Sequence, residues 1–510
     1  MERPVLLCYR CDDRDAGDPY ARIVPSGLFC LHGYLQDRGF PSLLANLCGM
    51  PWPRVEALIR QHQPRVVGVS HFTFNHAACE KLYRLARKVV PDAVIVGGGA
   101  QATHLDALLL ERIPALDLSV RGEGEVPLLA LAERVFRGER AWHGIPGLTR
   151  RDGDRIHREP LPPLLADIDP CYSPRRFSRL EGVAPREQFP FVVASRGCPG
   201  TCTFCNSPAI WRRQTRFRSP GPLADEIRAL QREHGLVYFS FRDDSFSADP
   251  GRVRAWCRVL GERKLRFLWN CQSRAEGLDR DTLLALKRAG CEQIQFGIET
   301  TAPPLQRLLG KPLPPGGVSD LLRDCRDCGV RTSAYFITGI PGQAEADLEG
   351  DLDLFRRGKL QDAVVSPLCL YPGTALARQA EKRGAVSPAD YLSGDTERLL
   401  VRRDPAALRL YDTLVRAADA ASRHNAFTLP EIRAHLAATG NCFSARMDLG
   451  RYWVSRRRPD LAERAWRDIV DEDPSNPVGL LALSDFLAAS GNRREARKWK
   501  DRATRALQYL

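Results

Sequence analysis

The sequence RGCPGTCTFC at residues 196–205 contains Cys198, Cys202 and Cys205 in a C-x3-C-x2-C pattern. Thiolates at this spacing can bind three irons of a [4Fe–4S] cluster from a single loop. The next cysteine is Cys257, so the fourth iron has no ligand close in sequence and is open to a substrate or cofactor. The alternatives are a zinc site or three unrelated buried thiols. A zinc ribbon would need a second cysteine pair or histidines downstream, which this stretch lacks, so the spacing favours the cluster.

The cysteine pattern resembles the signature of the radical S-adenosylmethionine (SAM) superfamily, C-x3-C-x-aromatic-C, with Phe204 as the aromatic residue. The resemblance implies that the three cysteines hold the cluster and that its open iron binds the amino and carboxylate groups of SAM. It also implies that one electron from the cluster cleaves SAM and releases a 5′-deoxyadenosyl radical. In such enzymes the cofactor carries the chemistry, while the protein positions, shields and tunes it.

Length, composition and charge are those of an ordinary globular protein. The 510 residues predict roughly two to four domains, and 44% hydrophobic and 27% charged residues are typical of folded chains. No apolar run approaches the ~18 residues of a membrane span, and MERPVLLCYR does not resemble a signal peptide. Sixteen cysteines without a regular framework predict a reducing compartment, so we expect the cytoplasm. The net charge of +13 is spread along the chain, often beside acids, which predicts a solvated surface and no nucleic-acid partner.

Upstream of the cysteines, two β-branched runs flank a helical stretch. RVVGVS at 65–70 and AVIVGGG at 93–99 enclose ACEKLYRLARKVV, which predicts a βαβ unit and a doubly wound parallel sheet. Ligands of such sheets bind at the carboxyl ends of the strands. Those ends carry Ser70 to Thr73, Gly97 to Gly99, and Gly122 with Glu123 in SVRGEGEVPLL. Taken alone, each glycine stretch is also explained by a tight turn after a strand.

Three stretches, GVSHFTFNHA, VIVGGGAQATH and VRGEGEVPLL, resemble in this order the cobalamin-binding domain of cobalamin-dependent radical SAM enzymes. The resemblance covers roughly residues 1–145 and implies that the strand ends contact cobalamin. The residues expected at cobalamin are Ser70, Phe72, Thr73, Gly97, Gly98, Gly99, Gly122 and Glu123.

The sequence lacks the D-x-H-x-x-G element with which other cobalamin proteins supply a histidine to the lower face of cobalt. Radical SAM relatives commonly lack it as well. Without that histidine, solvent or a loop side chain such as Phe72 or Phe74 fills the lower face and disfavours a ligand. A His71 or His76 ligand is the rival hypothesis, although each histidine also fits a capping or core position.

Residues 159–170 (EPLPPLLADIDP) contain four prolines and predict an interdomain linker. From FPFVVASRGC to AVVSPLCLYPG, strand-like and helix-like runs alternate, which predicts a TIM-like barrel in the partial (β/α)6 form of the superfamily. The expected fold class is therefore α/β with a helical C-terminal region. The expected domains are a Rossmann-like cobalamin-binding domain at 1–150, a linker at 151–185, a radical SAM barrel at 186–385 and a helical region at 386–510.

Polar residues follow several of the predicted barrel strands, at the end where catalysis occurs in such barrels. Asp243 and Asp244 stand where many family members have a glycine-glycine-glutamate that binds the SAM amino group. Glu299 resembles the acid that contacts the ribose hydroxyls or helps to place the sulfonium. Each residue alone is also explained as a surface acid or turn residue, but the recurrence favours a site. The residues expected at SAM are Phe204, Asp243, Asp244, Gln272, Ser273, Arg274, Glu299, Ile337 and Gly339.

Two further stretches leave alternatives open. WRRQTRFRS at 211–219 suits a nucleic-acid patch, but covering the cluster, packing domains or binding carboxylates is favoured. Near the C-terminus, Ala462 and Ala496 are 34 residues apart, which is the tetratricopeptide period, within a repeat-like part at about 445–508. A helical cap docked on the barrel is slightly preferred over a partner-binding module.

These resemblances imply a cobalamin-dependent radical SAM methyltransferase that moves a methyl group from SAM, via methylcobalamin, to an unactivated carbon. A non-methylating cyclisation or rearrangement is the alternative, and a non-catalytic scaffold is a remote one. The expected cofactors are a [4Fe–4S] cluster, SAM and cobalamin. The expected partners are a small-molecule or peptide substrate, an external electron donor of flavodoxin or ferredoxin type, and a protein bound by the C-terminal helices.

Overall fold

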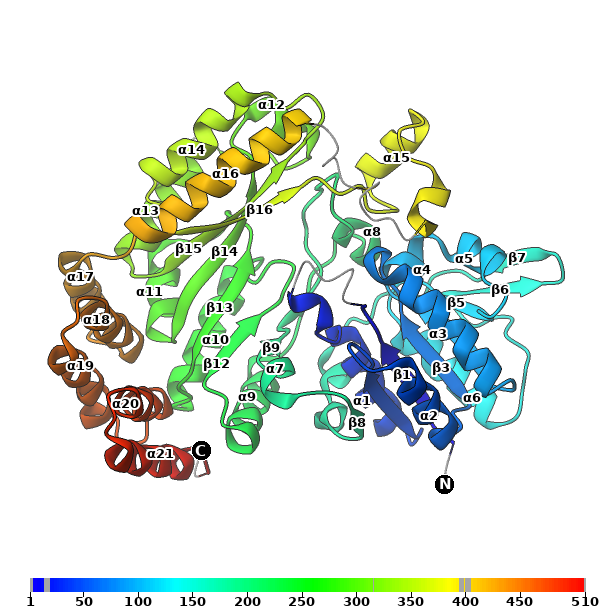
Figure 1. The fold of residues 1–510 in the computed structure, drawn as a ribbon, viewed down its shortest axis with the longest axis horizontal. Coiled ribbons are helices and arrows are strands. Elements are labelled where there is room, and N and C mark those ends of the chain that lie inside the picture. The colour runs from blue at the N-terminus through cyan, green and yellow to red at the C-terminus, as the bar shows by residue number, and fades with distance from the viewer. Residues whose placement is uncertain (1–2, 13–18, 315, 394–398, 400–404, 509–510) are drawn as a thin grey trace. The chain divides into compact units, whose positions relative to one another are not determined.

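The computed structural model describes residues 3–12, 19–314, 316–393, 399 and 405–508 (Figure 1). The chain forms two compact units, each assembled from three separate segments. The first unit comprises Met1–Gln188, Pro199–Phe217 and Cys369–Leu400. The second comprises Phe189–Cys198, Arg218–Leu368 and Val401–Leu510. Both units are therefore discontinuous in sequence, and the domain boundaries expected from the sequence stay a prediction.

The first unit is built on an eight-stranded sheet of order β7-β6-β5-β4-β3-β1-β2-β8. Its strands are β1 (Val5–Tyr9), β2 (Ser42–Asn46), β3 (Val66–Ser70), β4 (Val94–Gly98), β5 (Leu118–Val120), β6 (Leu148–Asp152), β7 (Arg155–Arg158) and β8 (Leu180–Glu181). Neighbours from β8 to β5 pair in parallel, and β6 and β7 add an antiparallel hairpin at one edge. The apolar runs of β1 and β3 are buried throughout, as in strands covered on both faces.

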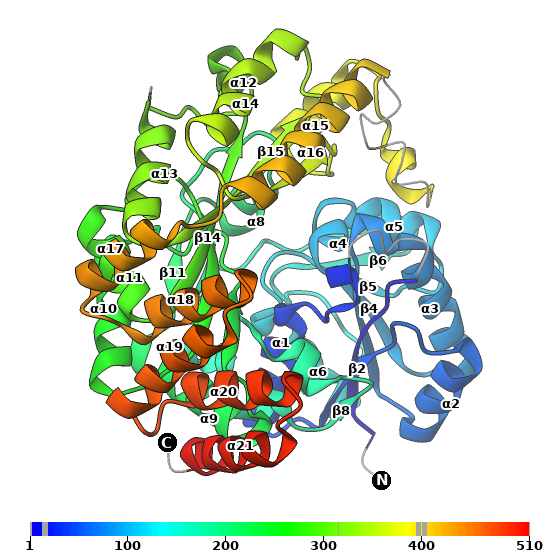
Figure 2. The ribbon, with the colours of Figure 1, turned by 60° about the vertical axis from the view of Figure 1, so that its left-hand side comes forward.

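Helices cover both faces of this sheet and give it the predicted doubly wound form. They are α1 (Ser26–Asp37), α2 (Trp52–His62), α3 (His76–Val89), α4 (Ala100–His104), α5 (Asp106–Arg112) and α6 (Glu125–Phe136). Figure 2 shows α1 and α6 on one side of the sheet and α2 and α3 on the other. Because the parallel strands share one direction, their carboxyl ends meet at one edge. We call the residues that end or follow β3, β4 and β5 at this edge the rim.

Besides Pro199–Phe217, two other parts of the chain outside residues 1–150 belong to the first unit. β7 and β8 come from the interval 151–185, which the sequence predicts to be a linker. Residues 369–393 contribute α15 (Ala375–Lys382) and the short 3-10 helix η7 (Pro388–Leu392). Tyr391 of η7 is buried in a small apolar cluster against which Leu105, from the end of α4, packs. This returning segment is a part of the first unit that the βα pattern does not predict.

The second unit is built on a six-stranded parallel sheet of order β16-β15-β14-β13-β12-β9. Its strands are β9 (Phe191–Val192), β12 (Tyr238–Phe241), β13 (Leu268–Ser273), β14 (Cys291–Glu299), β15 (Arg331–Thr338) and β16 (Asp362–Pro367). The helices that alternate with them are α9 (Pro220–His234), α10 (Pro250–Glu262), α11 (Arg280–Arg288), α13 (Gly317–Asp327) and α14 (Glu349–Arg356). This is the alternating βα arrangement that the sequence predicts for a partial barrel.

The two faces of the barrel sheet differ in character. On one face, Phe241 packs edge-on against Trp256 of α10 and Trp269 of β13, and Phe336 packs against Phe355 of α14. Because strand side chains alternate, the intervening positions lie on the opposite face. On that face, hydroxyl and amide groups form hydrogen bonds with one another, whereas on the first face aromatic rings pack against helices. We call it the polar face, formed by Tyr238, Ser240, Asn270, Gln272, Gln295 and Tyr335.

The C-terminal part of the second unit is entirely helical in its described residues. Its helices are α16 (Pro405–His424), α17 (Leu429–Thr439), α18 (Phe443–Ser455), α19 (Pro459–Glu472), α20 (Pro477–Ala489) and α21 (Arg493–Gln508). α17 and α18 pack on α11, α17 also contacts α13, and α21 contacts α9. Lys287 of α11 is fully buried and lies 2.6 Å from Asp448 of α18. The helices are therefore docked on the barrel, as the cap interpretation predicts, while their tetratricopeptide character stays a prediction.

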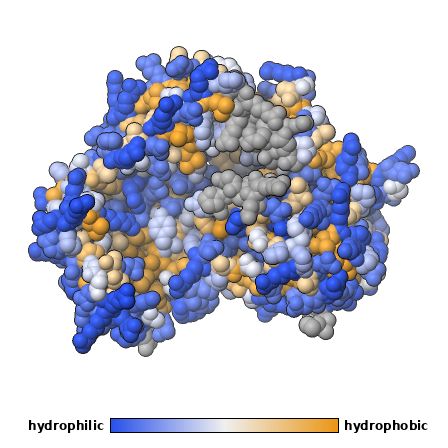
Figure 3. All heavy atoms as spheres, in the orientation of Figure 1, coloured by the Kyte–Doolittle hydropathy of each residue, from blue (hydrophilic) through white to orange (hydrophobic). Residues whose placement is uncertain are grey.

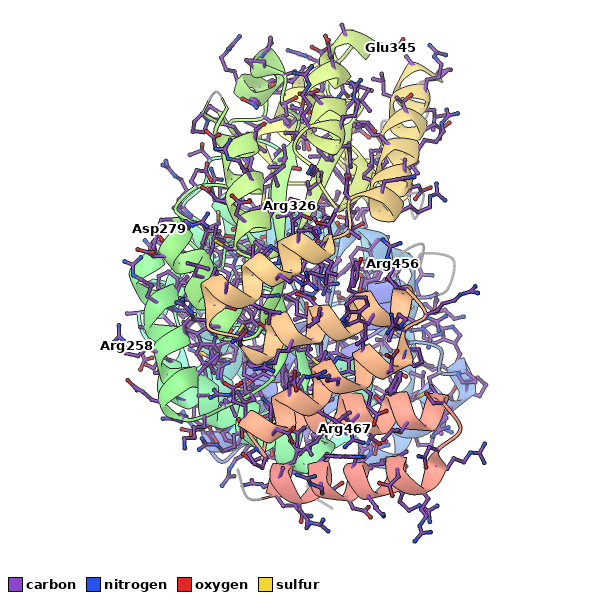
Figure 4. All side chains as sticks on the ribbon, turned by 90° about the vertical axis from the view of Figure 1, so that its left-hand side faces the viewer. Arg258, Asp279, Arg326, Glu345, Arg456 and Arg467 are labelled. Atoms are coloured by element: carbon purple, nitrogen blue, oxygen red, sulfur yellow. The ribbon has the colours of Figure 1, made fainter. Side chains whose placement is uncertain are left out.

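Arg326 ties α13 to α17 and is labelled in Figure 4, where the C-terminal helices are seen from the side. Its guanidinium donates to both oxygens of Glu431, at 2.7 and 2.9 Å. Hydrophilic side chains dominate the face over α20 and α21 in Figure 3, so much of the positive charge of α21 is solvated. In the described part of the chain, no helix is both long and apolar enough to span a membrane.

Candidate cluster and cofactor sites

The predicted cluster ligands lie on one loop that follows the short strand β10 (Ser195–Arg196). Cys198, Cys202 and Cys205 are half-buried and form no disulfide. The Ser207 N–H donates to the Cys205 sulfur at 3.4 Å. Three thiolates on a partly accessible loop are the donor set that a [4Fe–4S] cluster requires.

Among the described residues, no group of three or more His, Cys, Asp or Glu side chains converges on a single metal ion. This is compatible with a cluster, because each thiolate of a cubane binds its own iron and the three sulfurs need not meet at one point. The cysteine loop is thus compatible with the predicted cluster.

Asp243 and Asp244, at the end of β12, support the start of the cluster loop. Asp243 is buried and accepts hydrogen bonds from the Ala194 N–H, at 3.3 Å, and from the Ser195 hydroxyl. Burial raises the pKa of Asp243 to about 6, although nearby Arg252 and these hydrogen bonds oppose the shift. Asp244 is exposed and accepts from the Gly197 N–H at 3.1 Å. The sequence predicts this pair at the SAM amino group; that contact stays a prediction, and positioning of the loop is the role the contacts support.

Glu299, at the end of β14, is part of a buried ion pair that the sequence does not reveal. Its carboxylate lies 2.9 Å from Nζ of Lys311, and both side chains are buried. Glu299 adopts a left-handed conformation with φ +67°, which turns the chain away from the strand. A Cβ at Gly297 would lie 2.5 Å from both Glu299 Oε1 and Lys311 Nζ, so a larger residue there would displace the ends of these two side chains. Lys311 follows the strand by twelve residues in a proline-rich loop, and no local motif marks it.

Gln272, predicted at SAM, belongs to a hydrogen-bonded group on the polar face. Its Nε2 donates to the Tyr335 hydroxyl at 2.9 Å, and that hydroxyl donates to Gln295 Oε1 at 3.0 Å. All three side chains are half-buried. Gln295 and Tyr335 were not assigned to the site from the sequence. The available signal was that each is a polar residue between two apolar positions of a predicted strand. The group offers neutral donors and acceptors from three adjacent strands.

The remaining predicted SAM residues occupy different surroundings. Ser273 is buried and its hydroxyl is hydrogen-bonded to that of Ser247. Arg274 pairs with Glu276 at 2.8 Å. Ile337 is buried near the end of β15, and Gly339, just beyond, has φ +74°, which favours glycine. The structure thus places Gln272, Ser273, Glu299 and Ile337 at the carboxyl ends of three adjacent strands, as predicted, while their contacts with SAM stay a prediction.

In the first unit, the predicted cobalamin residues lie along the rim. Ser70 of β3 and Gly98 of β4 are direct neighbours in the parallel register. A Cβ at Gly97 would lie 2.8 Å from the Tyr83 hydroxyl, and one at Gly99, which has φ +95°, would lie 2.9 Å from the His71 carbonyl oxygen. A Cβ at Gly98 would have nothing within 4 Å. Gly98 is therefore the open position, where a flat ligand has room beside the backbone.

The two rim histidines, His71 and His76, are both buried and contact each other. His71 is fully buried, with Nδ1 3.2 Å from the Tyr83 hydroxyl and Nε2 3.0 Å from His76 Nδ1. Burial, and then the neighbouring His76, lowers the pKa of His71 well below its ordinary value, so the ring is neutral. With both ring nitrogens engaged, His71 is disfavoured as a cobalt ligand.

The two phenylalanines on the same loop are partly exposed and could therefore contact a bound cofactor. Phe72 and Phe74 stack on each other with centroids 5.3 Å apart and an interplanar angle of 9°, and both are half-exposed. Between them, Thr73 donates to Gln101 Oε1 at 2.7 Å, and Gln101 Nε2 donates to the Tyr391 carbonyl at 2.9 Å. The loop thus presents an aromatic surface. Hydrogen bonds through Gln101 connect the loop to Tyr391 of the returning segment.

Gly122 and Glu123 complete the rim after β5. Gly122 has φ +74°, and its N–H donates to the Thr103 hydroxyl at 3.1 Å. Both carboxylate oxygens of Glu123 lie 2.8 Å from Nη1 of Arg216, in the arginine-rich stretch after the cluster cysteines. Carboxylate binding is one of the three roles favoured for that stretch, and Arg216 contacts a carboxylate of the protein itself. A direct contact of Glu123 with cobalamin stays a prediction, since its carboxylate is occupied by the protein.

Comparisons with known proteins match both parts of this arrangement. The model of the Radical SAM superfamily matches residues 192–355, and that of the B12 binding domain matches residues 17–132. An uncharacterized methyltransferase of Pyrococcus horikoshii is 26% identical over 359 residues, which are 69% of this chain and 77% of that protein. The anaerobic magnesium-protoporphyrin IX monomethyl ester cyclase of Cereibacter sphaeroides is 30% identical over 302 residues, which are 57% of this chain and 49% of the cyclase.

A solved structure has the same fold. The radical SAM methyltransferase TsrM from Kitasatospora setae, with cobalamin and a [4Fe–4S] cluster bound, has a TM-score of 0.64 at 19% identity. The match covers 82% of this chain and 89% of TsrM. The radical SAM domain implies a [4Fe–4S] cluster, SAM and an external electron donor, and the B12 binding domain implies cobalamin. With the two models together matching more than half of its length, the chain belongs to the cobalamin-binding radical SAM family of enzymes.

Proposed function

We propose that this enzyme is a methyltransferase that moves a methyl group from SAM, by way of cobalamin, to an unactivated carbon of its substrate. The observation that carries the proposal is the pairing of a cobalamin-type rim with a cluster-binding loop in one chain. The similarity to the Pyrococcus methyltransferase, which extends over 77% of that protein, supports it.

The cofactors supply the reactive species: with SAM, the cluster provides a 5′-deoxyadenosyl radical, and cobalamin carries the methyl group. The residues of the chain bind and orient them. Cys198, Cys202 and Cys205 would hold the cluster and leave one iron open for SAM, with Phe204 beside it. Asp243 and Asp244 would fix the start of the cluster loop. Glu299, whose charge is balanced by Lys311, would place its carboxylate near the ribose of SAM. The other residues proposed at SAM are Gln272, Ser273, Arg274, Ile337 and Gly339.

At cobalamin, the open Gly98 and the neighbouring Ser70 would lie against the corrin side chains. Phe72, stacked on Phe74, would cover the lower face of the metal without supplying a ligand. Exclusion of water from the metal suits a methyl carrier, because a weakly ligated methyl group is more easily released. Thr73, Gly97, Gly99, Gly122 and Glu123 would shape the same surface from the backbone side.

A second candidate is a non-methylating radical reaction such as ring formation. The 30% identity to the Cereibacter cyclase favours it, although the matched part is only 49% of that protein. The polar face does not decide between the two, since Gln272, Gln295 and Tyr335 can hydrogen-bond to a substrate in either reaction.

Anaerobic incubation of the reconstituted enzyme with methyl-labelled SAM and reduced cobalamin separates these candidates without a known substrate. We expect label in the cobalamin fraction, together with S-adenosylhomocysteine. If neither forms while 5′-deoxyadenosine does, the methyltransferase is excluded and the radical rearrangement remains. Replacement of Cys198, Cys202 and Cys205 by alanine should abolish 5′-deoxyadenosine formation, and retained formation would contradict the cluster assignment.

The proposal extends to partners and compartment. We infer a small-molecule or peptide substrate, and an electron donor of flavodoxin or ferredoxin type. A reducing compartment, taken as the cytoplasm, is part of the proposal because a partly exposed cluster and sixteen cysteines without disulfides require it. We also infer a protein partner for the C-terminal helices, on surfaces other than those with which α17, α18 and α21 contact the barrel helices.

A further inference from the structure

The chain that follows Cys198 belongs to the first unit, which also carries the rim. We call this stretch, Pro199–Phe217, the cluster segment. It contains Cys202 and Cys205 and ends at the short strand β11 (Arg216–Phe217). Contacts inside the first unit therefore determine how two of the three cluster cysteines are placed relative to the rim.

Arg216 makes the most direct contact between the cluster segment and the rim. Its Nη1 donates to both carboxylate oxygens of Glu123, each at 2.8 Å, and to the Leu165 carbonyl at 2.9 Å. The Leu165 N–H donates back to Glu123 Oε2 at 3.0 Å. Arg216 and Glu123 are each 8% exposed. A charge-assisted contact in such a dry position is short, directional and little screened by salt.

The rest of the Arg216 guanidinium makes no competing bond. Its Nε and Nη2 are buried and have no hydrogen-bond partner among the residues that the structure describes. All polar attachment of this side chain therefore passes through Nη1, to Glu123 and the adjacent Leu165. Replacing Arg216 removes this side-chain connection to Glu123, while the pairing of β11 with β10 and the bond from Arg212 Nη2 to the Pro162 carbonyl, at 2.9 Å, remain.

A second connection joins the other end of the cluster segment to the returning segment. The Leu376 N–H donates to the carbonyl of Thr203 at 2.8 Å, between Cys202 and Phe204. The returning segment is in turn fixed to the rim, because the Tyr391 carbonyl accepts from Gln101, which also binds Thr73. The cluster segment is thus held to the rim both directly, by Arg216, and indirectly, by the returning segment.

We propose that the Glu123–Arg216 ion pair is a positioning device that sets the separation and orientation of the cluster relative to cobalamin. The inference rests on the proposed function, in which a radical generated at the cluster and a methyl group carried by cobalamin must reach the same substrate carbon. A misplacement of about 1 Å between reacting groups costs about 100-fold in rate. Glu123 and Arg216 act through the groups that they hold in place, and touch neither reacting atom.

Replacement of Arg216 by glutamine tests the proposal, with electron paramagnetic resonance as the main readout. In the reduced enzyme, cobalt(II) of cobalamin and the reduced cluster are both paramagnetic, and their dipolar interaction reports the distance between them. We expect R216Q to retain its iron content and to bind cobalamin within about three-fold of the wild-type affinity. We expect its dipolar interaction to lose the single defined value of the wild type, and label transfer from SAM to fall about 100-fold.

Arg87→Gln is the matched control. Arg87 pairs with Asp117 at 2.6 Å in the same unit, but near the amino ends of β4 and β5, opposite the rim. We expect R87Q to keep the wild-type dipolar interaction. The charge-swapped variant E123R/R216E should recover part of the wild-type value, which a role in overall stability alone would not predict.

A wild-type dipolar interaction in folded, cofactor-loaded R216Q would overturn the proposal. If R216Q does not fold, Arg216→Lys replaces it, since lysine keeps the charge at Glu123 and lacks the planar donor set. An unchanged interaction in R216K, or failure of both variants to fold, would also overturn it and leave the ion pair as a stability element. The measurement needs no methyl transfer, so absence of label with an intact wild-type interaction contradicts the proposed function and not this inference.

Discussion

Three consecutive glycines end β4, and their neighbours give each a different role. Gly97 and Gly99 face protein atoms within 3 Å of an added Cβ, so they are required for packing. Gly98 has free space and an ordinary backbone conformation, so the fold itself does not require glycine there. We therefore expect the proposed cofactor to approach the backbone at Gly98, where there is room for it.

Gly98→Ala should therefore separate binding from stability. We expect cobalamin affinity to fall about ten-fold or more, because the added methyl group occupies the space proposed for the cofactor, while the thermal unfolding midpoint stays close to the wild-type value. The matched variant Gly97→Ala should destabilise the first unit by roughly 1–3 kcal/mol, since its Cβ meets the Tyr83 hydroxyl. Equilibrium dialysis and calorimetry measure the two effects. Wild-type cobalamin affinity in G98A would show that the open position does not face the cofactor.

At the scale of elements, the ionised carboxylate of Glu431 contributes to the docking of α17. Burial opposes ionisation of Glu431, but hydrogen bonds from Arg326 and from Thr428 outweigh it and lower the pKa to about 2. Thr428 and Glu431 also form a capping box that begins α17. The same carboxylate thus starts the helix and fastens it to α13.

The pH dependence of this element follows from the direction of that shift. A carboxyl group whose pKa is lower in the folded state stabilises the fold above its ordinary pKa, and the contribution is lost as pH falls through the folded value. We therefore expect hydrogen exchange of α17 amides to become faster, relative to α10, as pH falls from about 4.5 to about 2. Glu431→Gln should weaken protection already at pH 7 and flatten this dependence. Glu463→Gln, in an exposed pair with Arg467 on α19, serves as the control and should leave it unchanged.

At the scale of the whole molecule, each unit has its own core, and the helical cap belongs to only one of them. Lys287 and Asp448 join the cap to the barrel as a buried pair. Removing one member of such a pair leaves an uncompensated charge and costs about 3–5 kcal/mol. Lys287→Met should therefore lower the unfolding free energy of the second unit and leave the first unchanged.

Urea unfolding followed by probes in each unit would measure this difference. The double variant K287M/D448L removes both charges and should recover most of the lost stability, since apolar replacement of both partners is often neutral. Equal destabilisation of both units by K287M would show that they do not unfold independently.

Local sequence patterns predicted most of the architecture and only part of the site. Alternating βα runs predicted the doubly wound sheet and the partial barrel, and cysteine spacing predicted the cluster loop. Lys311, Tyr335 and Arg216 were not assigned their roles, because each acts through a partner that chain folding brings close: Glu123 and Arg216, for example, are 93 positions apart. The return of residues 369–393 to the first unit was missed for the same reason. The hydrophobic pattern of a segment without strands does not indicate which unit it packs against.

The segmented division of the chain has a consequence for how the protein is made. The polypeptide passes between the two units five times, so neither unit is a continuous stretch of gene. A nascent chain cannot complete the first unit until residues 369–400 have left the ribosome, by which time all six strands of the barrel sheet have been synthesised. Both units therefore finish folding late in translation, and a fragment cut at any single position would lack part of at least one of them.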